Sequence, residues 1–285
     1  MASEEIAGAR LVRVRAGGGE IHVGAIAGER VDVFAEADPL IVLTGGRLPE
    51  PIESVPLIDC ELLAPLIPPE TWAAGVTYER SREARLRESR VADVYDLVYE
   101  AERPELFLKD AAGRRTVGPG EPIAARGDAT WTVPEPELAV VIGADRTPLA
   151  VTIGNDVSSR DIEGANPLYL PQAKIYARAC ALGPALFVPP DWTATFEIHL
   201  RIADADGETV FEDRTSTASM CRSLTELIEY LFRDNPVPAG TVLLTGTGIV
   251  PPDDVTLTAG QSVEITIPEI GTLRNPVGAL EVTHV

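Results

Sequence analysis

The chain has 285 residues, of which 45% are hydrophobic and 24% are charged, so it can form one large domain or a large domain with a small partner. Its 44 acidic residues outnumber its 24 lysines and arginines, and the formal net charge is −20. This charge disfavours nucleic acid and acidic membrane surfaces as partners, because both are polyanions. The three cysteines are widely spaced without a CxxC motif, so the sequence predicts neither a disulfide framework nor a zinc knuckle.

Two further patterns bear on where the protein acts. The first ten residues include acids and lack an apolar core, unlike a signal peptide. The longest uninterrupted apolar stretch covers about residues 138–142, which is far too short to span a membrane. We therefore expect a cytoplasmic protein.

The N-terminal part is predicted to form a small β-rich domain. Residues 10–34 alternate apolar and polar side chains in three runs, separated by glycines at 17–19 and by charged turns, and this pattern predicts a β-meander. Six prolines follow between residues 49 and 69, which is typical of an irregular crossover. We place a domain boundary near residue 68, with the small domain and its crossover at 1–68 and the larger domain at 69–285.

Two segments of the larger domain have helical patterns. Residues 79–90 are highly charged and predict a helix with a solvated face. Residues 223–234 begin with Ser223 and Glu226 in the spacing of a capping box, which predicts a helix start. Four apolar residues of this second segment form one stripe that belongs in a core: Leu224, Leu227, Ile228 and Leu231.

The rest of the larger domain is rich in strand patterns. Residues 137–143 and 148–154 predict a hairpin, and residues 195–204 and 208–214 predict a second hairpin around an Asp-Gly turn. Further strands are predicted at 241–247, 262–267 and 278–284. Many strands and few helices favour a mixed β (α+β) fold built as a β-sandwich or roll.

Several familiar chemistries are absent from the sequence. It contains no GxGxxG, GxxxxGK[ST], HExxH or GxSxG motif. His22 and His199 lie within strand patterns and His284 is next to the C-terminus, so a catalytic triad built on histidine is not expected. Any chemistry must therefore use carboxylates and lysine, with or without a metal.

Three carboxylates are predicted to converge on the first hairpin. Glu135 and Glu137 are two residues apart on a strand and share a face, and Glu135 lies opposite Asp156 if the turn centres on residues 145 and 146. Three such charges repel unless a cation lies among them, and Mg²⁺ (or Mn²⁺) suits oxygen ligands. The alternative is that the glutamates face solvent and the aspartate caps a turn.

These residues belong to a set of motifs that resembles the fumarylacetoacetate hydrolase family. The motifs are Glu-x-Glu at 135–137, NDVSSRD at 155–161 and a lysine, Lys174, shortly before a Gly-Pro pair. The resemblance continues at 104–109, 243–248 and 269–277, and covers about residues 70–285. Within the family the chain is most similar to dehydratases of 2-keto-3-deoxy-pentonates, on the stretches 75–85 and 163–174.

The resemblance implies a β-sandwich roll with a smaller N-terminal domain, a homodimer or homotetramer, and a divalent metal. It implies that the three carboxylates are metal ligands, that Lys174 is the active-site lysine and that Lys109 is a second pocket lysine. These two are the only lysines among the 24 cations of the chain. The resemblance also places four residues at the substrate: Arg160, Thr247, Tyr78 and Ser81.

One departure from the family bears on the reaction. Hydrolases of the family carry a lid His and Glu that prepare the attacking water, and here these positions are Ser81 and Ala84. We therefore expect metal-dependent dehydration of a 2-keto-3-deoxy-pentonate to 2,5-dioxopentanoate, since elimination needs no attacking water. The alternatives are an acylpyruvate hydrolase, an oxaloacetate decarboxylase or a non-catalytic protein that binds sugar acids.

Two points of mechanism stay open at this level. Lys174 either takes the C3 proton of the 2-oxo acid or supplies charge only, which leaves a water or a carboxylate as the base. The acid that assists departure of the C4 hydroxyl is Lys109, Glu163 or an ordered water. Polar side chains of Glu163, Asn166 and Tyr169 are further candidates to contact the substrate hydroxyls.

Overall fold

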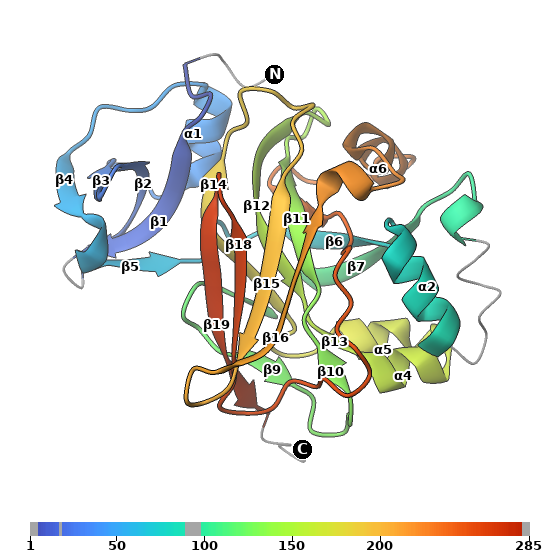
Figure 1. Cartoon of the computed structure of the whole chain (residues 1–285). Coiled ribbons are helices and arrows are strands. Elements are labelled where there is room, and N and C mark those ends of the chain that lie inside the picture. The colour runs from blue at the N-terminus through green and yellow to red at the C-terminus, as the bar shows by residue number, and fades with distance from the viewer. Residues whose placement is uncertain (1–4, 17–18, 89–97, 281–285) are drawn as a thin grey trace.

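The computed structural model describes residues 5–16, 19–88 and 98–280. Within them, two sheets pack face to face, and all but one of the labelled helices lie at one side of the molecule (Figure 1). No described helix is long and apolar enough to cross a membrane. The predicted β-sandwich with few helices is confirmed.

The larger sheet has twelve strands, ten of which follow the order β4-β3-β2-β1-β14-β12-β11-β17-β6-β7. Its remaining strands are β5, which pairs with β1, and β8, which pairs with β14. The bounds of the twelve strands are β1 Arg10–Ala16, β2 Ile21–Ala27, β3 Arg30–Val33, β4 Glu53–Pro56, β5 Cys60–Leu63, β6 Glu70–Gly75, β7 Glu105–Ala111, β8 Thr116–Val117, β11 Pro136–Ile142, β12 Pro148–Asp156, β14 Cys180–Phe187 and β17 Thr241–Leu244.

The N-terminal meander is confirmed, because β1, β2 and β3 pair antiparallel in sequence order. β1 also pairs with β14 through Arg10 and Phe187, so the N-terminal strands continue the large sheet rather than form a separate one. The helix α1, Pro39–Gly45, follows this meander and is capped by the side chain of Asp38. The domain boundary near residue 68 stays a prediction.

The second sheet has five strands in the order β16-β15-β18-β19-β9. Their bounds are β9 Ile123–Ala125, β15 Glu197–Ala203, β16 Thr209–Ser216, β18 Ser262–Ile267 and β19 Gly271–Ala279. Alternate residues of β15, such as Ile198 and Leu200, point into a core that they share with Leu138 and Ile153 of the large sheet. The two inner faces therefore form one hydrophobic layer.

The central hairpin of the large sheet is buried on both faces, since a second apolar cluster that includes Val42 and Leu43 of α1 covers its other side. Its register is the predicted one, with Glu137 opposite Gly154 and Pro136 opposite Asn155. The hairpin thus positions the residues at its open end very firmly.

The helices match the sequence patterns in part. The bounds of the remaining helices and of the small β10-β13 sheet are α2 Glu79–Glu88, α4 Arg160–Ala165, α5 Leu170–Lys174, α6 Leu224–Leu231, β10 Thr132–Val133 and β13 Ser158–Ser159, with single 3₁₀ turns η1 Leu57–Asp59, η2 Pro167–Tyr169 and η3 Thr217–Ser219. The Ser223 side chain accepts from the Glu226 N–H, so the predicted start of α6 is confirmed. The end of the predicted first helix, at 89–90, lies outside the described residues.

Three predicted boundaries differ from the structure by three residues or more. The strand predicted over 241–247 ends at Leu244. The helix predicted over 223–234 ends at Leu231, because Asp234 adopts a positive φ of 54° that a helix does not allow. The last strand begins at Gly271 rather than at residue 278, because it pairs with β18 as soon as the chain turns back after Ile267. The end of that predicted strand, residues 281–284, lies outside the described residues.

Candidate active site

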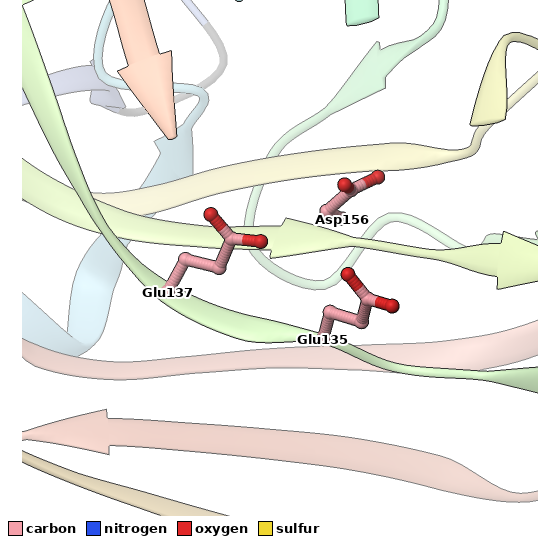
Figure 2. Close-up of side chains that lie close together, drawn as sticks. All are labelled: Glu135, Glu137 and Asp156. Atoms are coloured by element: carbon pink, nitrogen blue, oxygen red, sulfur yellow. The ribbon is translucent and has the colours of Figure 1, made fainter. Parts of the chain in front are cut away.

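The three predicted carboxylates meet at the open end of the central hairpin (Figure 2). Glu135 and Glu137 lie at the start of β11 and Asp156 ends β12, and the Asp156 N–H donates to the Glu135 carbonyl at 2.9 Å. Oxygens from all three lie within 4.8 Å of one another, and each residue is at most 4% exposed. The three are therefore a buried cluster and not solvent-facing strand ends.

Lys174, the last residue of α5, extends its ammonium group into this cluster. Its Nζ lies 2.8 Å from Glu135 Oε2, 2.9 Å from Asp156 Oδ2 and 2.5 Å from Ser158 Oγ. The Ser158 hydroxyl donates its proton to the Asp156 carbonyl, so its oxygen accepts from Lys174. Lys174 thus makes three donor contacts, which a protonated lysine provides and a neutral one does not.

Lys109 lies behind the cluster. Its side chain is fully buried, with Nζ 2.5 Å from Asp156 Oδ1, 3.0 Å from the Val157 carbonyl and 2.6 Å from the Lys174 carbonyl. These contacts tie the end of β12 to the end of α5. Lys109 is not among the residues that line the pocket described below.

A bulge in β7 aims Lys109 at the cluster. Thr71 pairs with Asp110 and Trp72 pairs with Leu108, so Lys109 is the extra residue on β7. Such a bulge breaks the regular ladder and re-aims a side chain.

Arg160 also supports the cluster from behind. It begins α4 and its guanidinium lies 3.0 Å from Glu135 Oε1, with the side chain 1% exposed. Glu163 is three residues further along the same helix, on the same buried face, and lines the pocket. The helix therefore presents one charge to the carboxylate cluster and one to the pocket.

Glu137 is supported differently from its two neighbours. In the described part of the chain it has no ion pair, and its carboxylate accepts from the Gly246 N–H at 2.5 Å. Burial raises its pKa well above the ordinary value, and the nearby Asp156 and Glu135 charges add to this effect. A cation bound among the three carboxylates would act in the opposite direction and lower the pKa of Glu137.

The cluster opens into a small pocket. The residues that line it are Ala74, Gly75, Val76, Ser81, Glu105, Phe107, Glu135, Asp156, Glu163, Lys174, Gly246 and Thr247. The structure thus brings Ser81, Thr247 and Lys174 together with two of the three carboxylates. Tyr78 is buried behind the wall, and burial raises the pKa of its hydroxyl strongly.

Two expectations about the pocket change in the structure. Asn166 caps η2 and Tyr169 is 44% exposed, and neither lines the pocket, so of the three polar candidates for the hydroxyls only Glu163 faces it. Glu105 lines the pocket but was not singled out from the sequence. The signal available was the alternation in β7, which places Glu105 and Phe107 on one face.

Glu105 and Phe107 shape the wall beside the lysine. Glu105 is opposite Gly75 in the register, and its carboxylate occupies the space that a side chain at Gly75 would need. The ring of Phe107 lies 5.6 Å from Lys174 Nζ, a cation–π distance that favours the charged lysine.

The charges and donor set of this site fit a divalent cation. Among the described residues, the five carboxylates at the site outnumber the three cations that lie near them. The carboxylates are Glu105, Glu135, Glu137, Asp156 and Glu163, and the cations are Lys109, Arg160 and Lys174. Three converging carboxylates with no sulfur or imidazole are the ligand type that Mg²⁺ and Mn²⁺ prefer.

Within the described residues, neither of the α2 positions that correspond to the lid His and Glu of the family's hydrolases carries a group that can activate water. Ser81 donates its hydroxyl proton to the Tyr78 carbonyl at 2.7 Å, and Ala84 is fully buried. None of the pocket-lining residues is a histidine.

A comparison of the sequence with protein-family models shows which family has this fold and carboxylate cluster. The family model for the fumarylacetoacetate (FAA) hydrolase C-terminal region matches residues 72–278. The chain belongs to the fumarylacetoacetate hydrolase family.

Two relatives are similar over most of the chain. The chain is 48% identical over 221 residues to a probable 2-keto-3-deoxyxylonate dehydratase of Haloferax volcanii, covering 77% of this chain and 76% of that protein. It is 46% identical over 232 residues to the 2-dehydro-3-deoxy-D-arabinonate dehydratase of Saccharolobus solfataricus, covering 79% and 77%.

A solved structure extends the similarity to the whole fold. It is described as 2-keto-3-deoxy-D-arabinonate dehydratase complexed with magnesium and 2,5-dioxopentanoate, and it is 38% identical to this chain. The TM-score is 0.84, with 95% of this chain and 99% of that chain covered.

Proposed function

We propose that the chain is a hydro-lyase that removes water from a 2-keto-3-deoxy-pentonate and releases 2,5-dioxopentanoate. One observation carries the proposal: a buried carboxylate cluster forms the wall of a pocket in a chain 46–48% identical to two proteins named as dehydratases of such sugar acids. Those two names differ in the pentonate, so the proposal concerns the substrate class.

Glu135, Glu137 and Asp156 would hold Mg²⁺, for which their number, burial and charge are suited. When bound, such a cation polarises the 2-oxo group of the substrate and makes the C3 protons more acidic. Lys174, which lies beside two of these carboxylates, presents a further positive charge to the anionic substrate.

The geometry favours the electrostatic role of Lys174 over the role of base. Its three donor contacts, two of them to carboxylates, hold it in the charged form, which has no lone pair for a proton. Lys109 is fully buried and already has three acceptors, so it is poorly placed to act as the acid. We therefore assign the proton transfers to the two pocket carboxylates outside the cluster, Glu105 and Glu163.

The steps balance with these two groups. One carboxylate removes a proton from C3, and the electron pair of that C–H bond forms the C3–C4 double bond. The C4–O bond breaks and the hydroxyl leaves as water, with a proton from the second carboxylic acid. Transfer of a proton from C5 to C3 then gives the C4–C5 enol, and transfer of the enol O–H proton to C4 gives the aldehyde of 2,5-dioxopentanoate.

A proton-exchange measurement separates the two carboxylates. 2-Oxobutyrate has C3 protons but no C4 hydroxyl, so its deuterium exchange in D₂O reports removal of the C3 proton alone. We expect one of Glu105→Gln and Glu163→Gln to lose this exchange, and the other to keep it while losing dehydration. Normal exchange and dehydration in both variants would contradict the assignment.

A substrate panel tests the reaction class. With Mg²⁺ present, both 2-keto-3-deoxy-pentonates, acetylpyruvate and oxaloacetate are offered, and the products are followed by mass spectrometry. We expect 2,5-dioxopentanoate from at least one sugar acid, with the largest kcat/KM of the panel. Faster formation of pyruvate from acetylpyruvate would indicate a hydrolase, from oxaloacetate a decarboxylase, and binding without turnover a sugar-acid-binding protein.

We further propose a homodimer or homotetramer in the cytoplasm, on the basis of the family resemblance of the sequence. Light scattering coupled to size-exclusion chromatography measures the mass of the assembly against the 30.4 kDa of one chain. A monomer at micromolar concentration would contradict the oligomer.

A further inference from the structure

The three carboxylates of the cluster are not held by the same kind of group. Glu135 is ion-paired with Arg160 and Lys174, and Asp156 is ion-paired with Lys109 and Lys174. Glu137 depends instead on one backbone N–H, that of Gly246. Whatever fixes the 245–246 peptide therefore decides where the Glu137 carboxylate points.

The conformation of Gly246 leaves no room for a side chain. Its φ is +92°, which L side chains rarely adopt, and a Cβ would overlap Thr77 Oγ1 and lie 3.0 Å from the Ala74 carbonyl. Thr77 is thus packed directly against the Gly246 backbone. Its position limits how this peptide can rotate.

Thr77 also holds the same peptide by a hydrogen bond. Its hydroxyl donates to the Thr245 carbonyl at 2.7 Å, on the peptide whose N–H is that of Gly246. Since the C=O and N–H of one peptide point in opposite directions in a plane, fixing the carbonyl aims the N–H at Glu137.

Thr77 is itself firmly placed. It is fully buried, and its own carbonyl accepts from the Cys221 N–H at 2.9 Å. Its neighbour Tyr78 forms a bridge with Met220. The hydroxyl thus links a fixed wall of the pocket to the peptide that supports Glu137.

We propose that Thr77 is a positioning residue for the metal site, acting through the 245–246 peptide on Glu137. The inference rests on the proposed function, because Thr77 would support the metal site that is proposed there. Groups that orient metal ligands in this way typically contribute about 10–100-fold to metal affinity.

The test compares two substitutions in the full-length chain. Thr77→Val keeps the shape and removes the hydroxyl, whereas Thr77→Ser keeps the hydroxyl. Mn²⁺ binding is measured by the loss of the free-ion signal in electron paramagnetic resonance, with no substrate present. We expect Thr77→Val to weaken Mn²⁺ binding about 10–100-fold and Thr77→Ser to stay within about threefold of the parent chain.

A matched control separates positioning from general stability. Thr152 is also fully buried, and its hydroxyl donates to the Gly183 carbonyl at 3.3 Å, away from the 245–246 peptide. Thr152→Val should lower the melting temperature and leave the Mn²⁺ dissociation constant unchanged.

Three outcomes would contradict either the role of Thr77 or the metal site on which that role depends. Parent-like Mn²⁺ affinity in Thr77→Val, with only a lower melting temperature, would overturn it. Equal weakening in Thr77→Ser would also overturn it, because the hydroxyl is then not the responsible group. If Thr77→Val does not fold, Thr77→Ala is titrated in its place under the same criteria. A parent chain that binds no Mn²⁺ would instead contradict the proposed metal site.

Discussion

Two groups of charged residues in this protein have similar chemistry and very different surroundings. On the outer face of the five-stranded sheet, Arg201 lies 3.1 Å from Glu264, and Arg274 lies 3.3 Å from the same residue. In the candidate active site, Lys109 lies 2.5 Å from Asp156. The Arg201 side chain is 35% exposed, whereas that of Lys109 is completely buried.

Burial changes what such a pair does. An exposed pair is screened by water and contributes up to about 1 kcal/mol. A buried pair costs desolvation to form, and loss of one partner leaves an uncompensated charge, which costs about 3–5 kcal/mol. Loss of one partner from an ion pair of the buried cluster is therefore expected to destabilise the fold much more than loss of an exposed partner.

The largest effect is expected from Lys109→Met. Removing this ammonium leaves Asp156 without one of its two cations and two backbone carbonyls without their donor. We expect the free energy of unfolding to fall by about 3–5 kcal/mol, measured by urea denaturation. A loss below 1 kcal/mol would contradict the view that burial governs this pair.

Lys174→Met is expected to reduce kcat by about 10²–10³-fold, the usual cost of losing one preorganised electrostatic group. Lys174→Arg is the discriminating control, because it retains charge but cannot act as a base. If Lys174 supplies charge, the Arg variant keeps more activity than the Met variant. Equal loss in both would favour Lys174 as the base.

Glu137→Gln is expected to weaken Mg²⁺ binding by at least about tenfold in isothermal titration calorimetry, because one charged ligand is lost. The same change removes a buried charge that two neighbouring carboxylates disfavour. The metal-free variant should therefore melt at a higher temperature than the metal-free parent chain. Unchanged Mg²⁺ affinity would contradict the assignment of Glu137 as a ligand.

The smallest effect is expected from Arg201→Met on the outer sheet face. Because the pair with Glu264 is partly exposed, the free energy of unfolding should change by less than about 1 kcal/mol. Turnover and Mg²⁺ affinity should match those of the parent chain. A loss as large as that of Lys109→Met would remove the distinction between the two groups.

The register of the central hairpin, and hence the carboxylate cluster, could be predicted from the sequence. Period-two alternation fixed which residues share a face, and the turn at 144–147 fixed which residues are opposed, so Glu135 and Asp156 were expected to meet. The motifs around them were sufficient to indicate the family. These are local properties, which a strand and its turn encode within about twenty residues.

The set of side chains that reach the pocket could not be predicted from the sequence, because it depends on contacts between distant segments. Lys109 was expected to face it, but the bulge in β7 turns this residue behind Asp156, while Glu105 takes a place on the wall. Gly246 reaches Glu137 across 109 residues of sequence, and Thr77 reaches Thr245 across 168. Periodicity assigns a residue to a face of its own strand, but exposure and partners depend on which distant segments pack against that face.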